Sequence, residues 1–177
     1  MQRKTLQIAV LIFLLAFPAF SYAKKIPLLN FSKGEMPTDN ANCSVSLSEE
    51  HSDREGDFTL RIDFDGKGEG SAGEFQPKKG SWAVYKKAKY IVFNPSDKEV
   101  EFAFSVKGAK MTNTPENRKD WKIKLPPGRS EQEVSFEGAV CDDGKTPLDI
   151  SRIFIWKFRY YNSQAATVYV VKVWLED

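Results

Sequence analysis

The chain has 177 residues, with 26 Lys and Arg against 24 Asp and Glu and a formal net charge of +2. Arg3 and Lys4 lie in the first 23 residues, which contain no acid, so residues 24–177 keep 24 basic residues (26 less these two) against 24 acidic ones. A polyanion-binding protein needs a basic excess, so neutrality argues against nucleic acid as a ligand. The remaining length, about 150 residues, suits one domain.

Residues 1–23 have the order of a secretory signal peptide. A basic region at positions 3–4 precedes an apolar run over 6–17, and Ser21 and Ala23 place small residues three and one before a cut. The run is shorter than the roughly 20 residues that cross a bilayer. We expect cleavage after Ala23 and a periplasmic or secreted protein without a membrane span. The alternative is an uncleaved membrane anchor.

The chain has two cysteines, Cys43 and Cys141. In an oxidising compartment an even pair commonly forms a disulfide, which here would close a loop of about 100 residues. The alternative is that the two thiols lie too far apart to meet. The pair has no CxxC spacing, and His51 is the single histidine, so the sequence predicts neither a metal site nor a cofactor.

Alternating apolar and polar residues predict strands along the mature chain. Turn residues separate these segments, and none carries a sustained helical stripe. Eight or nine short strands without crossover helices predict an all-β protein, an antiparallel β-sandwich (jelly roll) over residues 24–177. A glycine-rich stretch, Gly66–Gly80, is expected to be a surface loop. The strand candidates are 26–31, 45–47, 58–64, 90–93, 100–106, 121–125, 134–136, 153–161 and 167–175.

Several landmarks follow one another in a definite order. They are Asn30-Phe31, the strand at 58–62, Trp82 to Tyr85, Tyr90 to Pro95, Trp121, Leu125 to Gly128, Leu148 to Ile153 and the closing strand at 168–173. This order resembles the galactose-binding-domain-like jelly roll of many carbohydrate-binding modules in secreted bacterial proteins. The resemblance implies a sandwich fold and a sugar ligand.

Members of that group often hold a structural calcium with an acidic residue after the first strand and an aspartate in the last strand. The matching places here are Ser32 and Lys172 or Val173, which supply no carboxylate. A site could be rebuilt only from backbone carbonyls with Glu35 or Asp39, so we expect no bound calcium.

Sugar binding requires aromatic side chains that face water. In the strand 153–161, Trp156 and Tyr160 share one side with Phe154 and Phe158. This aromatic side either faces the core or lines a groove in which Trp156 and Tyr160 stack on sugar rings.

In the closing strand, Tyr169, Val171, Val173 and Leu175 predict the core side, and Trp174 lies on the mixed side. Trp174 is therefore a candidate stacking platform, the alternative being that it covers the sheet edge. Three loop amides complete the candidate ligand-binding set: Asn113, Asn117 and Asn162.

An enzymatic function finds no support in the sequence. His51 lies in a polar run without a nucleophile elbow, and Asp142 and Asp143 are adjacent, so on an extended chain their side chains point apart. We therefore expect an exported, non-catalytic carbohydrate-binding module whose partner is a glycan. The alternative is a structural or protein-interaction domain of the cell envelope with a protein partner and no sugar ligand.

Overall fold

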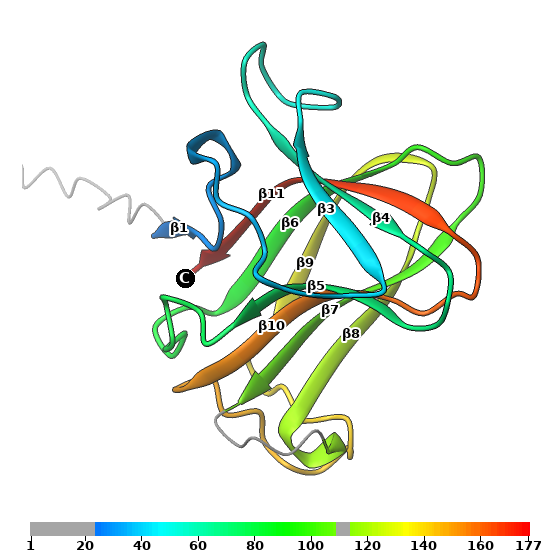
Figure 1. Cartoon of the computed structure of the whole chain (residues 1–177). Coiled ribbons are helices and arrows are strands. Elements are labelled where there is room, and N and C mark those ends of the chain that lie inside the picture. The colour runs from blue at the N-terminus through cyan, green and yellow to red at the C-terminus, as the bar shows by residue number, and fades with distance from the viewer. Residues whose placement is uncertain (1–23, 109–113) are drawn as a thin grey trace, which may run out of the picture.

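A computed structural model describes residues 24–108 and 114–177, which form two antiparallel β-sheets packed face to face (Figure 1). The predicted all-β antiparallel sandwich is confirmed. The signal peptide of residues 1–23 lies outside the described residues and stays a prediction, as do the domain boundaries. In the part of the chain that the structure describes, no helix is long and apolar enough to cross a membrane.

The first sheet, sheet A, has the strand order β3-β4-β11-β6-β9, and β1 pairs with the far end of β11. Its strands are β1 (Lys25–Pro27), β3 (Cys43–Ser48), β4 (Thr59–Phe64), β6 (Lys87–Asn94), β9 (Gly128–Ser135) and β11 (Ala166–Glu176).

The second sheet, sheet B, has the order β2-β5-β10-β7-β8. Its strands are β2 (Asp39–Ala41), β5 (Gly70–Phe75), β7 (Val100–Gly108), β8 (Arg118–Leu125) and β10 (Ile153–Tyr160), and two 3-10 turns, η1 (Phe31–Lys33) and η2 (Pro115–Asn117), lie in the connections. Each of the nine predicted strand segments overlaps a strand, although 26–31 does so only in β1 and ends in η1. The structure adds β2 and β5. Strand β5 lies within the glycine-rich stretch 66–80, so the prediction that this whole stretch is a surface loop is wrong.

An aromatic layer fills the space between the sheets. Phe104 of β7 is fully buried, and its ring lies 5.5 Å from Tyr90, 5.9 Å from Trp156 and 5.7 Å from Phe158, measured between centroids. Such aromatic pairs stabilise a core by about 0.5–1.5 kcal/mol each beyond the area that they bury. Because these rings face inward, the alternate residues of the same strands face water.

The closing strand departs from its predicted pattern. The register of β11 shifts between Val170 and Lys172, where Val171 is the extra residue of a β-bulge. The inward residues are therefore Val168 and Val170 before the bulge and Val173 after it. The prediction that Tyr169 and Val171 share the core side with Val173 is wrong, because a bulge reverses the alternation.

The expected disulfide is also absent, since Cys43 and Cys141 are both free thiols. Cys43 begins β3, and its Sγ lies 3.2 Å from the Ser71 carbonyl oxygen. Cys141 lies in the loop after β9, where its Sγ is 4.0 Å from the Pro147 carbonyl oxygen. The two thiols thus contact different parts of the sandwich.

Strand β5 requires glycine at position 73. A Cβ on Gly73 would lie 2.0 Å from the Trp156 carbonyl oxygen and 2.6 Å from the Lys157 Cα of the neighbouring strand. We predict that Gly73→Ala lowers the free energy of unfolding by roughly 2 kcal/mol or more, because backbone atoms would have to move. Urea denaturation measures this. Gly80→Ala is the matched control, because a Cβ at this position would have its nearest neighbouring atom 3.9 Å away. An equal loss of stability in both variants would contradict the prediction.

Candidate functional site

The outward side of sheet B, which we call the β10 face, carries a row of polar residues across four strands. Lys157 of β10 lies opposite Gly73 of β5 on one side and Ser105 of β7 on the other, and Ser105 lies opposite Asp120 of β8. In the next row, Arg159 of β10 has only the small residues Ser71 and Ala103 as neighbours. Small residues therefore form the floor beside these two long cations.

The two cations of β10 lie flat across this floor. The position of a Cβ on Gly73 would be 2.7 Å from the Lys157 Cγ, so the lysine stem runs directly over the glycine. The Lys157 Nζ reaches Asp39 at 2.9 Å, and Arg159 pairs with Glu69. Only 12% of the Lys157 side chain and 13% of the Arg159 side chain are exposed, so the centre of the face is a packed polar layer with paired charges.

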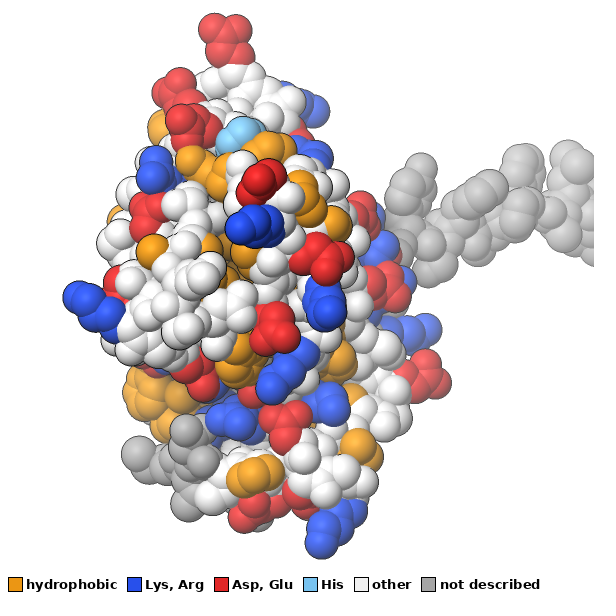
Figure 2. Space-filling model, turned by 90° about the vertical axis from the view of Figure 1, so that its right-hand side faces the viewer, with side chains coloured by type: hydrophobic (Ala, Val, Ile, Leu, Met, Phe, Trp, Pro, Cys, Tyr) orange, Lys and Arg blue, Asp and Glu red, His pale blue; other side chains and the backbone are white. Residues whose placement is uncertain are grey.

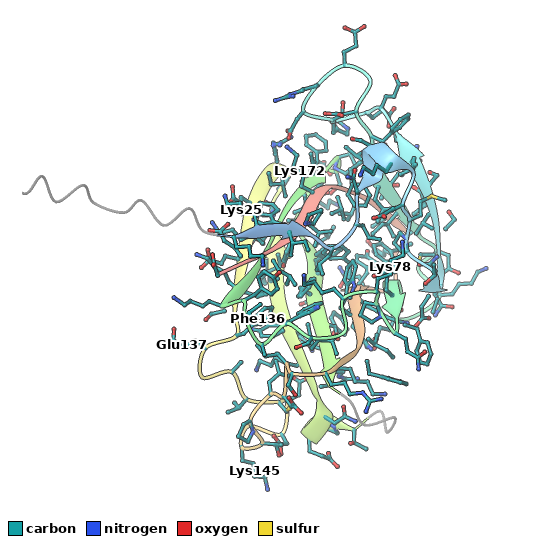
Figure 3. The ribbon with its side chains drawn as sticks, turned by 90° about the vertical axis from the view of Figure 1, so that its left-hand side faces the viewer. Lys25, Lys78, Phe136, Glu137, Lys145 and Lys172 are labelled. Carbon is teal, nitrogen blue, oxygen red and sulfur yellow. The ribbon has the colours of Figure 1, made fainter. Side chains whose placement is uncertain are left out.

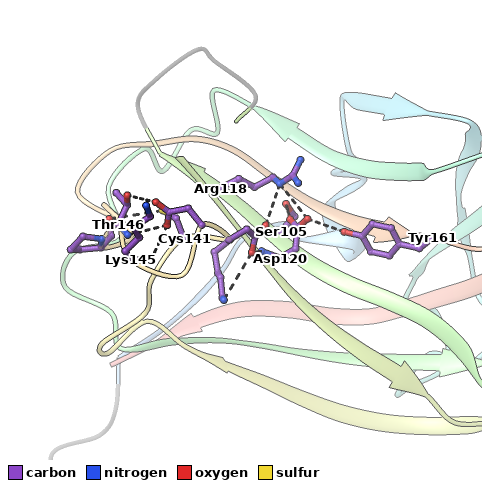
Figure 4. A network of polar contacts seen from close by, with 11 residues as sticks. Ser105, Arg118, Asp120, Cys141, Lys145, Thr146 and Tyr161 are labelled. Carbon is purple, nitrogen blue, oxygen red and sulfur yellow. Dashed lines mark hydrogen bonds and ion pairs between the residues drawn. The ribbon is translucent and has the colours of Figure 1, made fainter. Parts of the chain in front are cut away.

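The carboxylate of Asp120 organises the β8 edge of the β10 face (Figure 4). It accepts hydrogen bonds from the Ser105 hydroxyl and, at 2.9 Å, from the Tyr161 hydroxyl, and it pairs with the Arg118 Nε at 3.3 Å. Burial raises the pKa of the Tyr161 hydroxyl, and the Asp120 charge raises it further. The Tyr161 ring is thereby held in place, with the Lys122 Nζ 4.4 Å from its centroid.

An aromatic pair, exposed Phe75 and half-buried Phe154, marks one end of the face. Phe75, at the end of β5, is 45% exposed and meets Phe154 edge to face with 4.6 Å between ring centroids. Phe75 lies opposite Ile155 in the register, six residues before Tyr161 along β10. At about 3.3 Å per residue, the backbones of Ile155 and Tyr161 are about 20 Å apart. The Tyr161 ring lies closer than that, because its hydroxyl reaches Asp120, which shares the cross-strand row of Lys157. The β10 face is thus a polar strip with one aromatic side chain at Phe75 and another, from Tyr161, that points back along it.

A second surface feature lies on the outward side of sheet A. Strand β11 pairs with β4 as far as Val170, but beyond the Val171 bulge its neighbour is β1, with Pro27 opposite Trp174. This change of partner leaves an open groove of about 450 Å³, the Trp174 groove, in which Ile91 and Val171 supply apolar lining. Its charged lining residues are Lys25, Lys172, Asp53 and Asp57.

Two of the predicted stacking residues belong to the core instead. Trp156 is fully buried and its indole N–H donates to Glu74 at 3.2 Å. Tyr160 is 2% exposed and its hydroxyl donates to the Gln164 carbonyl oxygen at 2.8 Å. The prediction that these rings stack on sugar is wrong, because the aromatic side of β10 faces the sandwich interior.

The asparagines predicted to bind a ligand differ in their exposure. Asn117 is 6% exposed, which leaves little of it for a ligand, whereas half-buried Asn162 follows Tyr161 at the end of the β10 face. Asn113 lies outside the described residues. Trp174 is half-buried in its groove. Among the described residues, no three His, Cys, Asp or Glu side chains gather where they could hold a metal ion.

Several residues of the β10 face were not predicted as site residues. Lys157, Arg159 and Tyr161 alternate with the aromatic core residues of their strand, so assigning the aromatic side to the core would have placed them on the surface. Phe75 was not predicted to lie in a strand because its strand contains Gly70 and Gly73, and glycine is uncommon in strands. No sequence signal shows that Asp39 and Glu69 would meet the cations of β10.

Family models and curated proteins gave no match to the sequence. Solved structures do match. The family 11 carbohydrate-binding module from Clostridium thermocellum, in complex with a beta-1,3-1,4-mixed-linked tetrasaccharide, has a TM-score of 0.64 at 16% identity over 88% of this chain and 96% of that chain. The family 30 module of the Clostridium thermocellum cellulosomal cellulase Cel9D-Cel44B has a TM-score of 0.60 at 7% identity over 86% and 96%.

An exo-beta-agarase has a TM-score of 0.62 at 14% identity, and the match covers 83% of this chain but only 24% of the agarase. The chain therefore corresponds to about a quarter of that enzyme's length. At these identities the likeness establishes the fold. The sandwich that the sequence landmarks imply is the one found in carbohydrate-binding modules.

The half-buried Glu74 provides a test of the core assignment. Burial raises the pKa of its carboxyl above the ordinary glutamate value, and the indole N–H of Trp156 opposes that rise. Because the folded pKa is raised, the wild type loses stability as pH increases through that value. We predict that Glu74→Gln, which keeps an acceptor for Trp156, is more stable than the wild type at about pH 7 and loses this advantage at about pH 4. Urea denaturation at both pH values measures the difference, and an advantage independent of pH would contradict the prediction.

Proposed function

We propose that this chain is an exported, non-catalytic carbohydrate-binding module that holds a glycan chain along the β10 face. The observation that carries the proposal is the polar strip between Phe75 and Tyr161, along which the backbone runs about 20 Å from Ile155, opposite Phe75, to Tyr161. An aromatic ring accepts the apolar side of a sugar ring, and the paired side chains between the two ends offer hydrogen bonds to hydroxyl groups.

The charges of the β10 face favour a neutral glycan. Lys157 is paired with Asp39 and Arg159 with Glu69, so neither cation has a free charge to offer an anion. The acids remain accessible, since 32% of the Asp39 side chain and 47% of the Glu69 side chain are exposed. On the side of the molecule shown in Figure 2, acidic and basic side chains are likewise interspersed rather than segregated.

Two further observations support a binding function without catalysis. The module of family 11 that shares this fold is described with a bound tetrasaccharide. The ring of His51 stacks on Phe93 with 3.6 Å between centroids and meets Tyr169 edge to face, so this side chain serves packing on the outer side of sheet A.

The test is affinity electrophoresis in gels that contain soluble neutral polysaccharides, among them a mixed-linkage β-glucan and agarose. We predict that the mature protein is retarded in at least one gel and that Phe75→Ala and Tyr161→Ala each weaken retardation roughly tenfold, which corresponds to about 1.4 kcal/mol of lost binding free energy. Val84→Ala, which truncates a side chain that is 71% exposed elsewhere, is the matched control and should behave as the wild type.

Two outcomes would count against this proposal. One is that Trp174→Ala abolishes retardation while Phe75→Ala and Tyr161→Ala behave as the wild type. This result would indicate that the glycan binds in the Trp174 groove. A complete glycan screen without any binder would favour the alternative, a structural or protein-binding domain of the cell envelope. Circular dichroism of each variant confirms that the sandwich remains folded.

A further inference from the structure

We infer that the Trp174 groove is a second ligand site, separate from the β10 face, that takes a sugar unit bearing a carboxylate. The groove lies on sheet A and the β10 face on sheet B, so the two surfaces are on opposite sides of the sandwich. The volume of the Trp174 groove, about 450 Å³, is within the range of small-molecule sites. The inference stands on groove geometry and charge, whether or not the β10 face binds a glycan.

The indole of Trp174 is a fixed apolar platform in this groove. Its N–H donates to the Glu176 carboxylate at 3.0 Å, which uses its polar edge and orients the ring. Pro27 lies opposite it on β1, and Ile91 and Val171 extend the apolar lining. A ring held in this way loses little side-chain freedom when a sugar stacks on it.

Two lysines stand beside this platform. Lys172 precedes Trp174 by two residues on the same side of β11, and the Lys25 Nζ lies 5.9 Å from the Trp174 ring centroid. Figure 3 shows both lysines on the side of the molecule where β1 lies. Their side chains are 61% exposed for Lys25 and 56% exposed for Lys172, so each can reach a ligand in the groove.

Each lysine can leave its present partner without leaving an acid unpaired. Asp53 is paired with both Lys172 and Arg129, and these two cations hold the pKa of its carboxyl below the ordinary value. Arg129 therefore still neutralises Asp53 when Lys172 turns to a ligand.

The same arrangement occurs at the other end of the groove. Glu176 lies 3.3 Å from the Lys25 Nζ and 3.9 Å from the Lys87 Nζ, and it also accepts the Trp174 N–H. Lys87 and the indole thus remain with Glu176 when Lys25 turns away.

These features select the class of ligand. An apolar ring platform suits the C–H side of a pyranose, and lysines that can exchange partners supply a countercharge for a carboxylate attached to that ring. A neutral sugar would use the platform alone. The two cations of β10 itself do not offer this second contact, because the structure pairs Lys157 and Arg159 individually with Asp39 and Glu69.

Isothermal titration of the mature protein with tetragalacturonate and with cellotetraose tests the inference. We expect tetragalacturonate to bind with a Kd below about 1 mM and to bind more weakly as salt rises. Trp174→Ala should abolish this binding, Trp174→Phe should retain it, and Lys172→Gln should weaken it roughly tenfold, or about 1.4 kcal/mol. Lys98→Gln, in the exposed turn between β6 and β7, is the matched control and should leave binding unchanged.

Three results would overturn the inference: no heat with tetragalacturonate, equal affinity for cellotetraose in the Trp174-dependent binding, or the same effect from inorganic sulfate alone. If Trp174→Ala fails to fold, the surface double variant Lys25→Gln and Lys172→Gln decides. Phe75→Ala separates the two sites, because it should impair neutral polysaccharide binding at the β10 face and leave tetragalacturonate binding intact.

Discussion

The aromatic packing between the sheets is the constraint on which the rest of the molecule depends. Phe104 contacts Tyr90 from sheet A and Trp156 and Phe158 from its own sheet, and all four rings are buried. Because side chains alternate along a strand, this inward set determines which residues reach water on the outer sides. The Lys157 side chain faces outward because Trp156 and Phe158 on either side of it face inward. The β10 face is thus a consequence of the core.

A single irregularity in β11 produces the second surface. The extra residue at Val171 shifts the register, and beyond it β1 replaces β4 as the neighbour of β11. Trp174 consequently lies on the outer side, next to a break between two strands, where a continuous neighbouring strand would leave no room for a groove. Bulges commonly re-aim side chains in this way.

The two surfaces differ in how their charges are arranged. On the β10 face, each cation of β10 has its own acid, and the network of Asp120 fixes the Tyr161 ring. In the Trp174 groove, two acids each have more than one partner, and the lysines beside the indole are more than half exposed. A chain that is neutral overall can therefore present one surface suited to uncharged ligands and another suited to a single anionic unit.

The sequence alone determined the strand periods, the absence of sustained helices and hence the antiparallel sandwich, because alternation is a local property that a chain carries with it. It also singled out Trp174. Tertiary structure decided the remainder. The glycine-rich β5 became a strand because Gly73 lets the backbone of β10 approach, and the Val171 bulge reversed the predicted faces of β11. Strand order decides which acid pairs with which cation, because residues distant in the chain become neighbours only when the sheets assemble. It also decides that Cys43 and Cys141 contact different regions.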